Sequence, residues 1–226
     1  MKRVLFFLLL TTSIVFSQEE ERSINLGDFN TIKTYRGLHV ELIKSENPKI
    51  IITGNKSKDV NIKNSNGVLK ISLAVLETFS ADEVNITVYF NDLLELISAN
   101  EGSKIFSNDK LIFEKINLKA TEAAEIDLNI ESSFIEVKAY TGGFVQLKGS
   151  VKNQNIVANT GGFYKGADLK SDDTMVRVYT GGDATVYAKN SVDANASVGG
   201  IIKIKGDPDK VSKKESLGGY VRNLNE

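Results

Sequence analysis

Apolar and polar residues alternate in short runs along the second half of the chain, and glycine pairs interrupt these runs. Residues 135–148 read IEVKAYTGGFVQLK, and residues 175–188 read MVRVYTGGDATVYA. Strict alternation predicts a β-strand with one buried face, and glycines between two such runs predict a tight turn. Each unit is therefore expected to contain a strand, a turn and a second strand.

The unit recurs at a nearly fixed interval. Successive glycine pairs are separated by 19, 20, 18 and 19 residues. A period near twenty is typical of solenoids, in which each coil buries its apolar face only against its neighbours. Glycine at a corner supplies a positive φ or lets the next coil approach closely. The expected corner glycines are Gly102, Gly142, Gly143, Gly161, Gly162, Gly181, Gly182, Gly199, Gly200, Gly218 and Gly219.

The period continues upstream with fewer glycines, at Glu101-Gly102-Ser103 and at Glu122-Ala123-Ala124. Regular coils are therefore predicted over residues 99–222. Residues 24–98 are rich in strand patterns but less regular, and Asn66-Gly67 between two of these patterns predicts a hairpin. No linker-like composition separates the two parts, so residues 18–226 are expected to form one domain, with 24–98 as its irregular N-terminal coils. The last coil carries Lys213 and Glu215 at core positions, which predicts a polar cap against strand addition.

The N-terminus has the pattern of an export signal. Lys2 and Arg3 precede a short apolar run, and Ser17 precedes a plausible cleavage site before Gln18. The run is too short for a good membrane span. We therefore expect a signal peptide over residues 1–17 and an exported protein in the periplasm, at the outer membrane or on the cell surface. No later segment predicts a transmembrane span.

Composition excludes several classes. The formal net charge is −1, so no overall field favours nucleic acid. Cysteine is absent, so an exported chain of this kind depends on packing and backbone hydrogen bonds rather than on disulfides. We expect no cofactor and no metal site.

The order of several weak motifs resembles the exported bacterial family of putative auto-transporter adhesins with a head GIN domain. The motifs are Phe29-x-x-Ile32 with residues 37–42, residues 66–71, residues 93–103, and residues 198–208. The resemblance implies a right-handed single-stranded β-helix of the pectin-lyase-like type, with 19–20 residues per coil here. It also implies a role in adhesion and no established catalytic residues. The usual Gly-Ser-Gly turns of the family are replaced here by Thr-Gly-Gly, so no ligand preference carries over.

Candidate catalytic groups are few. His39 is the only histidine, and no serine–acid pair accompanies it in sequence, so an exposed strand histidine is the simpler interpretation. Glu101 and Glu122 occupy equivalent corners of stacked coils, which lie about 4.8 Å apart, so the two carboxylates could approach each other for acid–base work or to bind a hard cation. Solvated turn glutamates are the simpler interpretation of this pair as well. Asp172-Asp173 and residues 207–209 lack the oxygen-ligand spacing of a dedicated calcium loop.

Large and basic side chains recur at outward positions beside the glycines. An exposed patch of this kind marks an interface with another molecule or a second copy. Because tryptophan is absent, self-association is slightly favoured over sugar stacking. The candidate binding face comprises Tyr140, Phe144, Phe163, Tyr179, Tyr220, Lys165, Lys203 and Arg222.

The sequence thus predicts an exported, non-enzymatic β-helix that presents a binding surface, as an adhesin or an envelope scaffold. A homo-oligomer, a glycan and a surface protein remain open as partners. The alternative is a polysaccharide lyase or hydrolase, but an acidic cluster with a facing base is not evident. A left-handed acyltransferase helix is excluded because no hexapeptide period is present.

Overall fold

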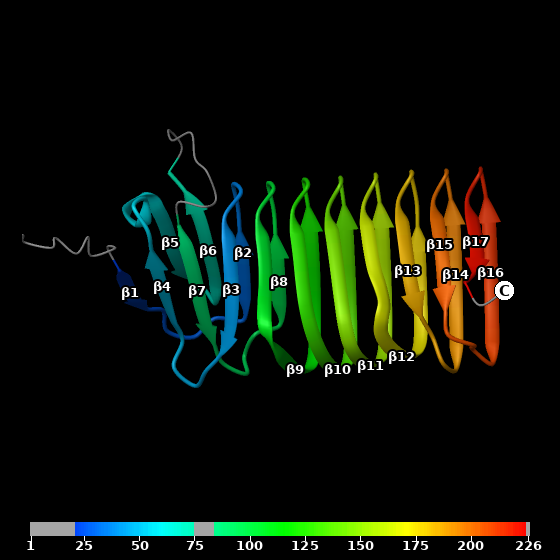
Figure 1. Ribbon diagram of the computed structural model, residues 1–226, viewed down its shortest axis with the longest axis horizontal. Helices are drawn as coiled ribbons and strands as arrows, with labels where there is room; N and C mark the ends of the chain where they lie inside the picture. Colours follow the sequence, from blue (N-terminus) through cyan, green and yellow to red (C-terminus); the bar gives the residue numbers. More distant parts are fainter. Residues whose placement is uncertain (1–20, 75–83, 225–226) are drawn as a thin grey trace, which may run out of the picture.

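The computed structural model describes residues 21–74 and 84–224, which form an all-β solenoid of about seven turns (Figure 1). The described strands belong to one hydrogen-bonded network of 17 strands. The predicted all-β solenoid is therefore confirmed. The predicted signal peptide lies outside the described residues. No helix among the described residues has the length and apolar character needed to cross a membrane.

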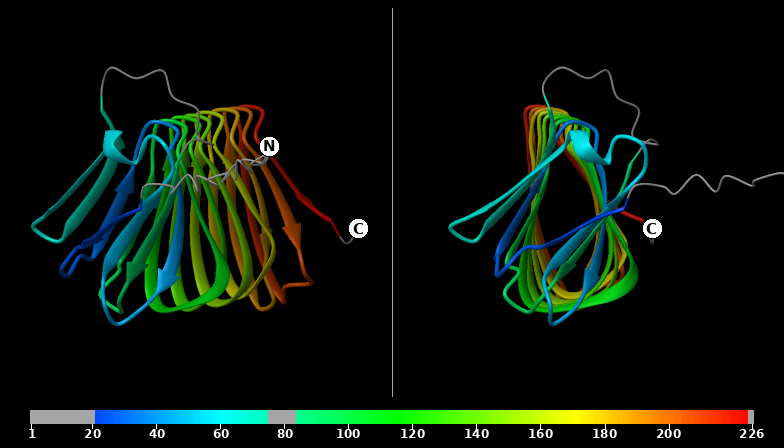
Figure 2. Two further views of the ribbon diagram at one scale, coloured as in Figure 1. Left: turned by 60° about the vertical axis from the view of Figure 1, so that its left-hand side comes forward. Right: turned by 90° about the vertical axis from the view of Figure 1, so that its left-hand side faces the viewer.

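The regular coils consist of long parallel strands that bend halfway. Viewed along the axis, each coil is a flattened ring with two walls, a tight turn at one end and a rounded bend at the other (Figure 2). The four long strands are β9 (Lys104–Thr121), β10 (Glu125–Tyr140), β11 (Phe144–Asn159) and β12 (Phe163–Val178). The shorter strands that continue them are β13 (Asp183–Tyr187), β14 (Ser191–Ser197), β15 (Ile201–Lys205), β16 (Lys210–Ser216) and β17 (Tyr220–Asn223).

We call the two sides wall A and wall B. Wall A contains the first halves of β9 to β12 with β13, β15 and β17, and wall B contains the second halves with β14 and β16. The core lies between the walls, where equivalent residues of successive coils stack in register. One such inward row, with every member at most 1% exposed, is Leu118, Val137, Ile156, Val176 and Ala194. Burial of these rows supplies about 25 cal/mol per Å² of apolar surface.

The two glycines of each corner have different roles. Thr141 and Gly142 have φ angles of 50° and 74°, and the amide of Gly143 donates to the carbonyl of Tyr140 at 2.9 Å. Two successive positive φ angles define a type I′ turn. The second glycine is required by packing, because a Cβ at Gly143 would lie 2.2 Å from the carbonyl oxygen of Ala120 in the preceding coil. The corner predicted at Glu122-Ala123 has the same turn, with φ angles of 58° at both residues.

The N-terminal part contains the predicted strands and the predicted hairpin. Its elements are β1 (Arg22–Asn25), β2 (Thr31–Thr34), β3 (His39–Lys44), β4 (Lys49–Thr53), the 3-10 turn η1 (Ser57–Asp59), β5 (Val60–Ser65), β6 (Val68–Leu73), β7 (Asn85–Phe90) and β8 (Leu96–Ala99). Asn66 and Gly67 connect β5 and β6 as an antiparallel hairpin, with φ angles of 52° and 75°.

The order of these strands in space differs from their order in the chain. Strand β2 pairs with β6 and β8, and β3 pairs with β7 and β9. The segment from β2 to β3 is thus a coil placed between strands that come later in the chain. Strand β7 lies between β3, which is parallel to it, and β4, which is antiparallel to it.

A polar cluster interrupts the apolar core where the coil length changes from 20 to 18 residues. Tyr164, Gln154, Ser171 and Thr174 are each at most 4% exposed. The amide nitrogen of Gln154 donates to Ser171 and Thr174, at 2.9 Å in both cases, and to the carbonyl of Tyr187 at 3.0 Å. These bonds satisfy polar groups that burial would otherwise destabilise.

Candidate functional site

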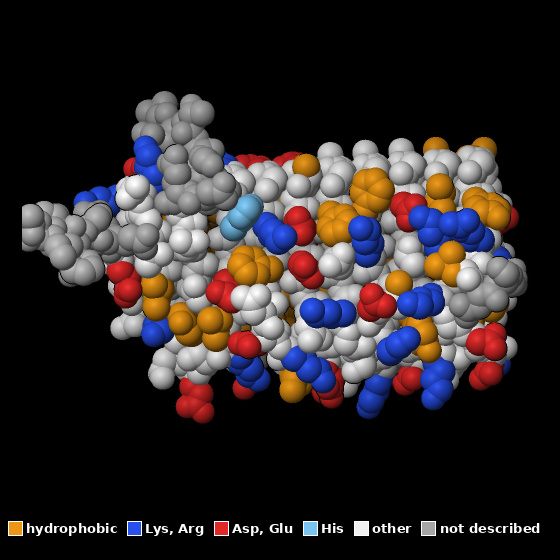
Figure 3. Space-filling view, viewed as in Figure 1, with side chains coloured by type: hydrophobic (Ala, Val, Ile, Leu, Met, Phe, Trp, Pro, Cys, Tyr) orange, Lys and Arg blue, Asp and Glu red, His pale blue; other side chains and the backbone are white. Residues whose placement is uncertain are grey.

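Wall A holds six of the eight residues of the predicted binding face. Phe144, Phe163 and Tyr220 lie in one register row, and Lys165, Lys203 and Arg222 lie in the next. Figure 3 shows this wall, identified by the only histidine of the chain, with hydrophobic and basic side chains spread along the solenoid axis.

The remaining two residues lie on the other wall. Tyr140 and Tyr179 are at the ends of wall B strands, immediately before the tight turns. Each turn reverses the direction of the chain. Tyr140 therefore faces outward from wall B, and Phe144 faces outward from wall A. The structure therefore does not bring the eight residues together as one surface.

The wall A residues contact one another. The Nζ atom of Lys165 lies 4.9 Å from the centroid of the Phe144 ring, a cation–π contact. Lys203 donates to Asp183, with 2.7 Å between Nζ and Oδ2. Phe163 and Tyr220 are 44% and 54% exposed, so no loop within the described part of the chain covers these two rings.

The candidate acid–base residues are solvated surface groups. His39 is exposed at the start of β3, and Glu101 pairs with Arg36 at 3.7 Å between Nε and Oε2. Burial of Tyr35 raises the pKa of its hydroxyl, and the nearby carboxylates of Glu101 and Glu122 raise it further. Among the described residues, no three His, Asp or Glu side chains gather in a way that could hold a metal ion.

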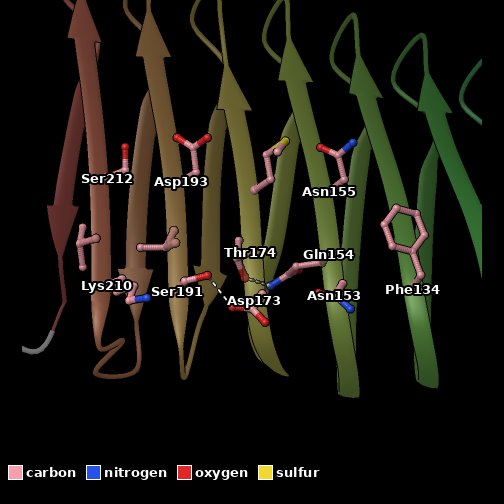
Figure 4. A pocket seen from close by; sticks show the side chains of 13 residues that line it. Phe134, Asn153, Gln154, Asn155, Asp173, Thr174, Ser191, Asp193, Lys210 and Ser212 are labelled. Carbon is pink, nitrogen blue, oxygen red and sulfur yellow. Dashed lines mark hydrogen bonds between the residues drawn. The ribbon is translucent and has the colours of Figure 1, made fainter.

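A groove of about 560 Å³ lies on wall B, near the rounded bend (Figure 4). It crosses the strands from β10 to β16. One register row runs along its lower edge, and a second row, two residues further along each strand, runs above it. The lower row is Phe134, Asn153, Asp173, Ser191 and Lys210, and the upper row includes Asn155, Met175, Asp193 and Ser212.

The groove combines an aromatic ring with hydrogen-bonding groups and exposed apolar surface. Phe134 stands at one end of the lower row (Figure 4), and Met175 is 39% exposed. The Oδ1 atom of Asn155 is buried and has no hydrogen-bond partner within the protein. An unpaired buried acceptor is costly unless a ligand or water satisfies it. Asp173 accepts a hydrogen bond from the hydroxyl of Ser191.

The floor of the groove is tied to the core. Gln154 and Thr174 line it between the two rows, and both belong to the buried polar cluster. Tyr164 donates to Gln154 from inside the ring, with 2.8 Å between Oη and Oε1. The floor is thereby fixed by hydrogen bonds on its inner side, and its side chains are ordered before any ligand arrives.

Sequence reasoning missed this groove, although a signal for it exists. Each residue of the lower row stands eight positions before the first glycine of the next pair. The number of residues between the preceding glycine pair and each of these positions varies from coil to coil, because the coils differ in length. The spacing to the following corner would have aligned Phe134, Asn153, Asp173, Ser191 and Lys210.

Several solved structures share this fold. A crystal structure described as "a putative adhesin" from Bacteroides fragilis is 18% identical to this chain, with a TM-score of 0.82. The alignment covers 92% of this chain and 98% of the Bacteroides fragilis chain. A second structure described as "a putative adhesin", from Parabacteroides merdae, has 17% identity and a TM-score of 0.71. It covers 92% of this chain and 97% of the Parabacteroides merdae chain. A structure titled "Putative lipid binding protein" from Parabacteroides distasonis has 16% identity, a TM-score of 0.67, and coverages of 92% and 97%. At these identities the likeness concerns the fold alone.

No curated protein matches the chain. The family model described as "Putative auto-transporter adhesin, head GIN domain" matches residues 28–208, in agreement with the resemblance seen in the sequence. Because the match spans most of the chain, this protein is a member of the head GIN domain family.

Proposed function

We propose that the protein is an exported, non-enzymatic binding protein of the adhesin type, and that the wall B groove binds a neutral saccharide chain. The groove carries the proposal, because it places an aromatic ring, three amides, two carboxylates and three hydroxyls along one shallow hollow. Apolar walls with a few placed polar groups are typical of small-ligand sites.

The chemistry of the groove favours a sugar. Asp173, Asp193 and the neighbouring amides can accept and donate hydrogen bonds to vicinal hydroxyls, and Phe134 can contact the apolar face of a pyranose ring. Lys210 offsets only one of the two carboxylates, so the local charge is −1 and an acidic polysaccharide is disfavoured.

The lyase or hydrolase alternative has less support. Acid–base cleavage of a glycosidic bond needs two carboxyl groups flanking the bond, one of them kept protonated near neutral pH by its surroundings. The groove carboxylates Asp173 and Asp193 lie in a solvated surface hollow, and the family description names adhesion rather than catalysis. Incubation with neutral and acidic polysaccharides, followed by an assay of new reducing ends, is expected to release no products. New reducing ends would favour the alternative.

The binding test compares groove variants with variants on the opposite wall. Purified protein is titrated by calorimetry with neutral and acidic oligosaccharides. Phe134→Ala and Asp193→Ala are expected to weaken binding of the neutral chain. Phe163→Ala and Lys203→Ala, which change wall A, serve as matched controls and are expected to leave affinity unchanged. Loss of binding only in the wall A variants would overturn the assignment of the groove.

Location is tested separately by treating intact native cells with a protease and blotting for the protein beside a soluble periplasmic marker. Cleavage of the protein with the marker intact is expected for a surface adhesin. Protection of both until the outer membrane is opened would contradict adhesion and leave a periplasmic scaffold as the role.

A further inference from the structure

The C-terminal end of the solenoid presents an unpaired strand edge. Among the described strands, β16 pairs only with β14, and all seven of its residues are exposed. Several of the exposed large hydrophobic residues also gather at this end. They are Val211 at 41%, Leu217 at 81%, Tyr220 at 54% and Leu224 at 42% exposure. Such an edge is a template for pairing with another strand.

The core side of β16 carries one apolar residue followed by a basic and an acidic residue. Val211, Lys213 and Glu215 stand opposite the buried residues Val192, Ala194 and Ala196 of β14. Lys213 and Glu215 thus continue an inward row, and no described strand pairs with the outer edge of β16. Charged groups at these positions oppose the addition of an ordinary apolar strand, as the sequence predicted.

The same pattern is complementary to itself. When two copies of β16 run antiparallel with Lys214 facing its own counterpart, Lys213 of each copy faces Glu215 of the other. Val211 then faces the region of Leu217 at either end. We propose that the protein forms a twofold dimer in which β16 pairs with β16 of a second copy, so that the two solenoids join end to end. This names the surface and the partner for the homo-oligomer left open by the sequence, and it lies beside the groove, which Lys210, Val211 and Ser212 of β16 also line.

This register makes two Lys213–Glu215 pairs on the core side of the strands, and its one like-charged contact, Lys214 opposite Lys214, lies on the solvent-exposed outward side. A slip of the pairing that keeps the core side inward places Lys213 opposite Lys213, or Glu215 opposite Glu215. Like charges directly opposite each other in a strand pair are destabilising, and a slip that reverses the faces would turn the inward row to solvent. The interface is isologous, as a twofold contact requires. Glu215 uses Oε1 to accept the amide of Val221, which leaves Oε2 for the lysine of the second copy.

Charge reversal tests the proposal. By sedimentation, the unaltered protein is expected at twice the chain mass. Lys213→Glu and Glu215→Lys each place like charges opposite each other, so each variant alone is expected at the chain mass. Mixed together, the two variants restore both attractive pairs and are expected to form a heterodimer. Lys214→Glu makes the same charge change one residue away, on the outward side, and is expected to remain dimeric. Circular dichroism of each variant checks that the fold is retained.

A cross-link locates the twofold axis. The chain has no native cysteine, so Lys214→Cys introduces the only thiol. Opposed residues of an antiparallel pair are about 4.5–5.5 Å apart at Cα, within the range of a disulfide. Mild oxidation is expected to give a covalent dimer of this variant. Asn195→Cys lies in register with Lys214 one coil away and is expected to stay uncross-linked. A monomeric unaltered protein, or a dimer that Lys213→Glu does not weaken, would overturn the proposal.

Discussion

The hydroxyl of Tyr164 donates a hydrogen bond to the side-chain oxygen of Gln154 at 2.8 Å, inside a core that is otherwise almost wholly apolar. The amide nitrogen of Gln154 reaches Ser171, Thr174 and the carbonyl of Tyr187. Because Gln154 and Thr174 also form the floor of the groove, this cluster links the packing of the solenoid to the shape of the candidate site.

Tyr164→Phe is expected to lower the free energy of unfolding by about 1–3 kcal/mol, because it leaves the Oε1 atom of Gln154 buried without a donor. Urea denaturation followed by circular dichroism measures the change. Tyr220→Phe, at a tyrosine that is 54% exposed, is the matched control and is expected to change stability by less than about 0.5 kcal/mol. Equal effects of the two changes would show that the internal bond contributes little.

Alkaline pH is expected to destabilise the protein in part through the same residue. Burial raises the pKa of Tyr164 above its ordinary value of about 10. The unfolded chain therefore loses this proton first as the pH rises, and the folded state is favoured less. The contribution of Tyr164 to the free energy of unfolding is fully present below about pH 10. Above that pH it falls by up to about 1.4 kcal/mol per pH unit. Unfolding curves of the unaltered protein and Tyr164→Phe between pH 8 and about 11 should converge as the pH rises. Parallel curves would contradict the raised pKa.

The two corner glycines are expected to respond differently to alanine. In Gly143→Ala the new Cβ would lie 2.2 Å from the carbonyl oxygen of Ala120, so backbone atoms of two coils must move. We expect a loss of about 3 kcal/mol or more. In Gly142→Ala the nearest atom is 3.8 Å away, and the cost is the left-handed φ alone, about 1–2 kcal/mol. Thermal unfolding of the two variants gives the comparison, and a larger loss for Gly142→Ala would contradict this division of roles.

The ion pair between Lys203 and Asp183 on wall A is expected to stabilise the fold only modestly. Its side chains are 26% and 25% exposed, so solvent screens part of the attraction. A double-mutant cycle with alanine at both positions should give a coupling free energy of about 0.2–1 kcal/mol, and added salt should reduce it. A coupling that does not respond to salt would indicate a packing effect rather than an ion pair.

Much of the regular part of the fold could be predicted from the sequence. The alternation around Ile135, Val137 and Ala139 specifies an inward face, and the Thr141-Gly142-Gly143 corner specifies the turn, because both depend on residues close together in the chain. The Asn66-Gly67 hairpin was predictable for the same reason. The family resemblance agreed with the later match to residues 28–208.

The candidate site was less accessible to such reasoning. Phe134, Asn153 and Asp173 come from successive coils and meet only through the register of three parallel strands. Coil lengths of 19, 20 and 18 residues change the sequence spacing of these positions, and the register of β11 with β12 shifts between Gln146 and Lys148. The predicted face failed to form one surface because the turn between Tyr140 and Phe144 directs them to opposite walls.

By itself the sequence determined the period, the buried rows and the corners, since local alternation and backbone preference act over a few residues. The tertiary structure alone decided that the coil from β2 to β3 lies between strands later in the chain, and that a groove crosses wall B. Both depend on which distant strands pair. Backbone hydrogen bonds are nearly the same for every candidate partner, so the pairing is set by the packing of the whole core.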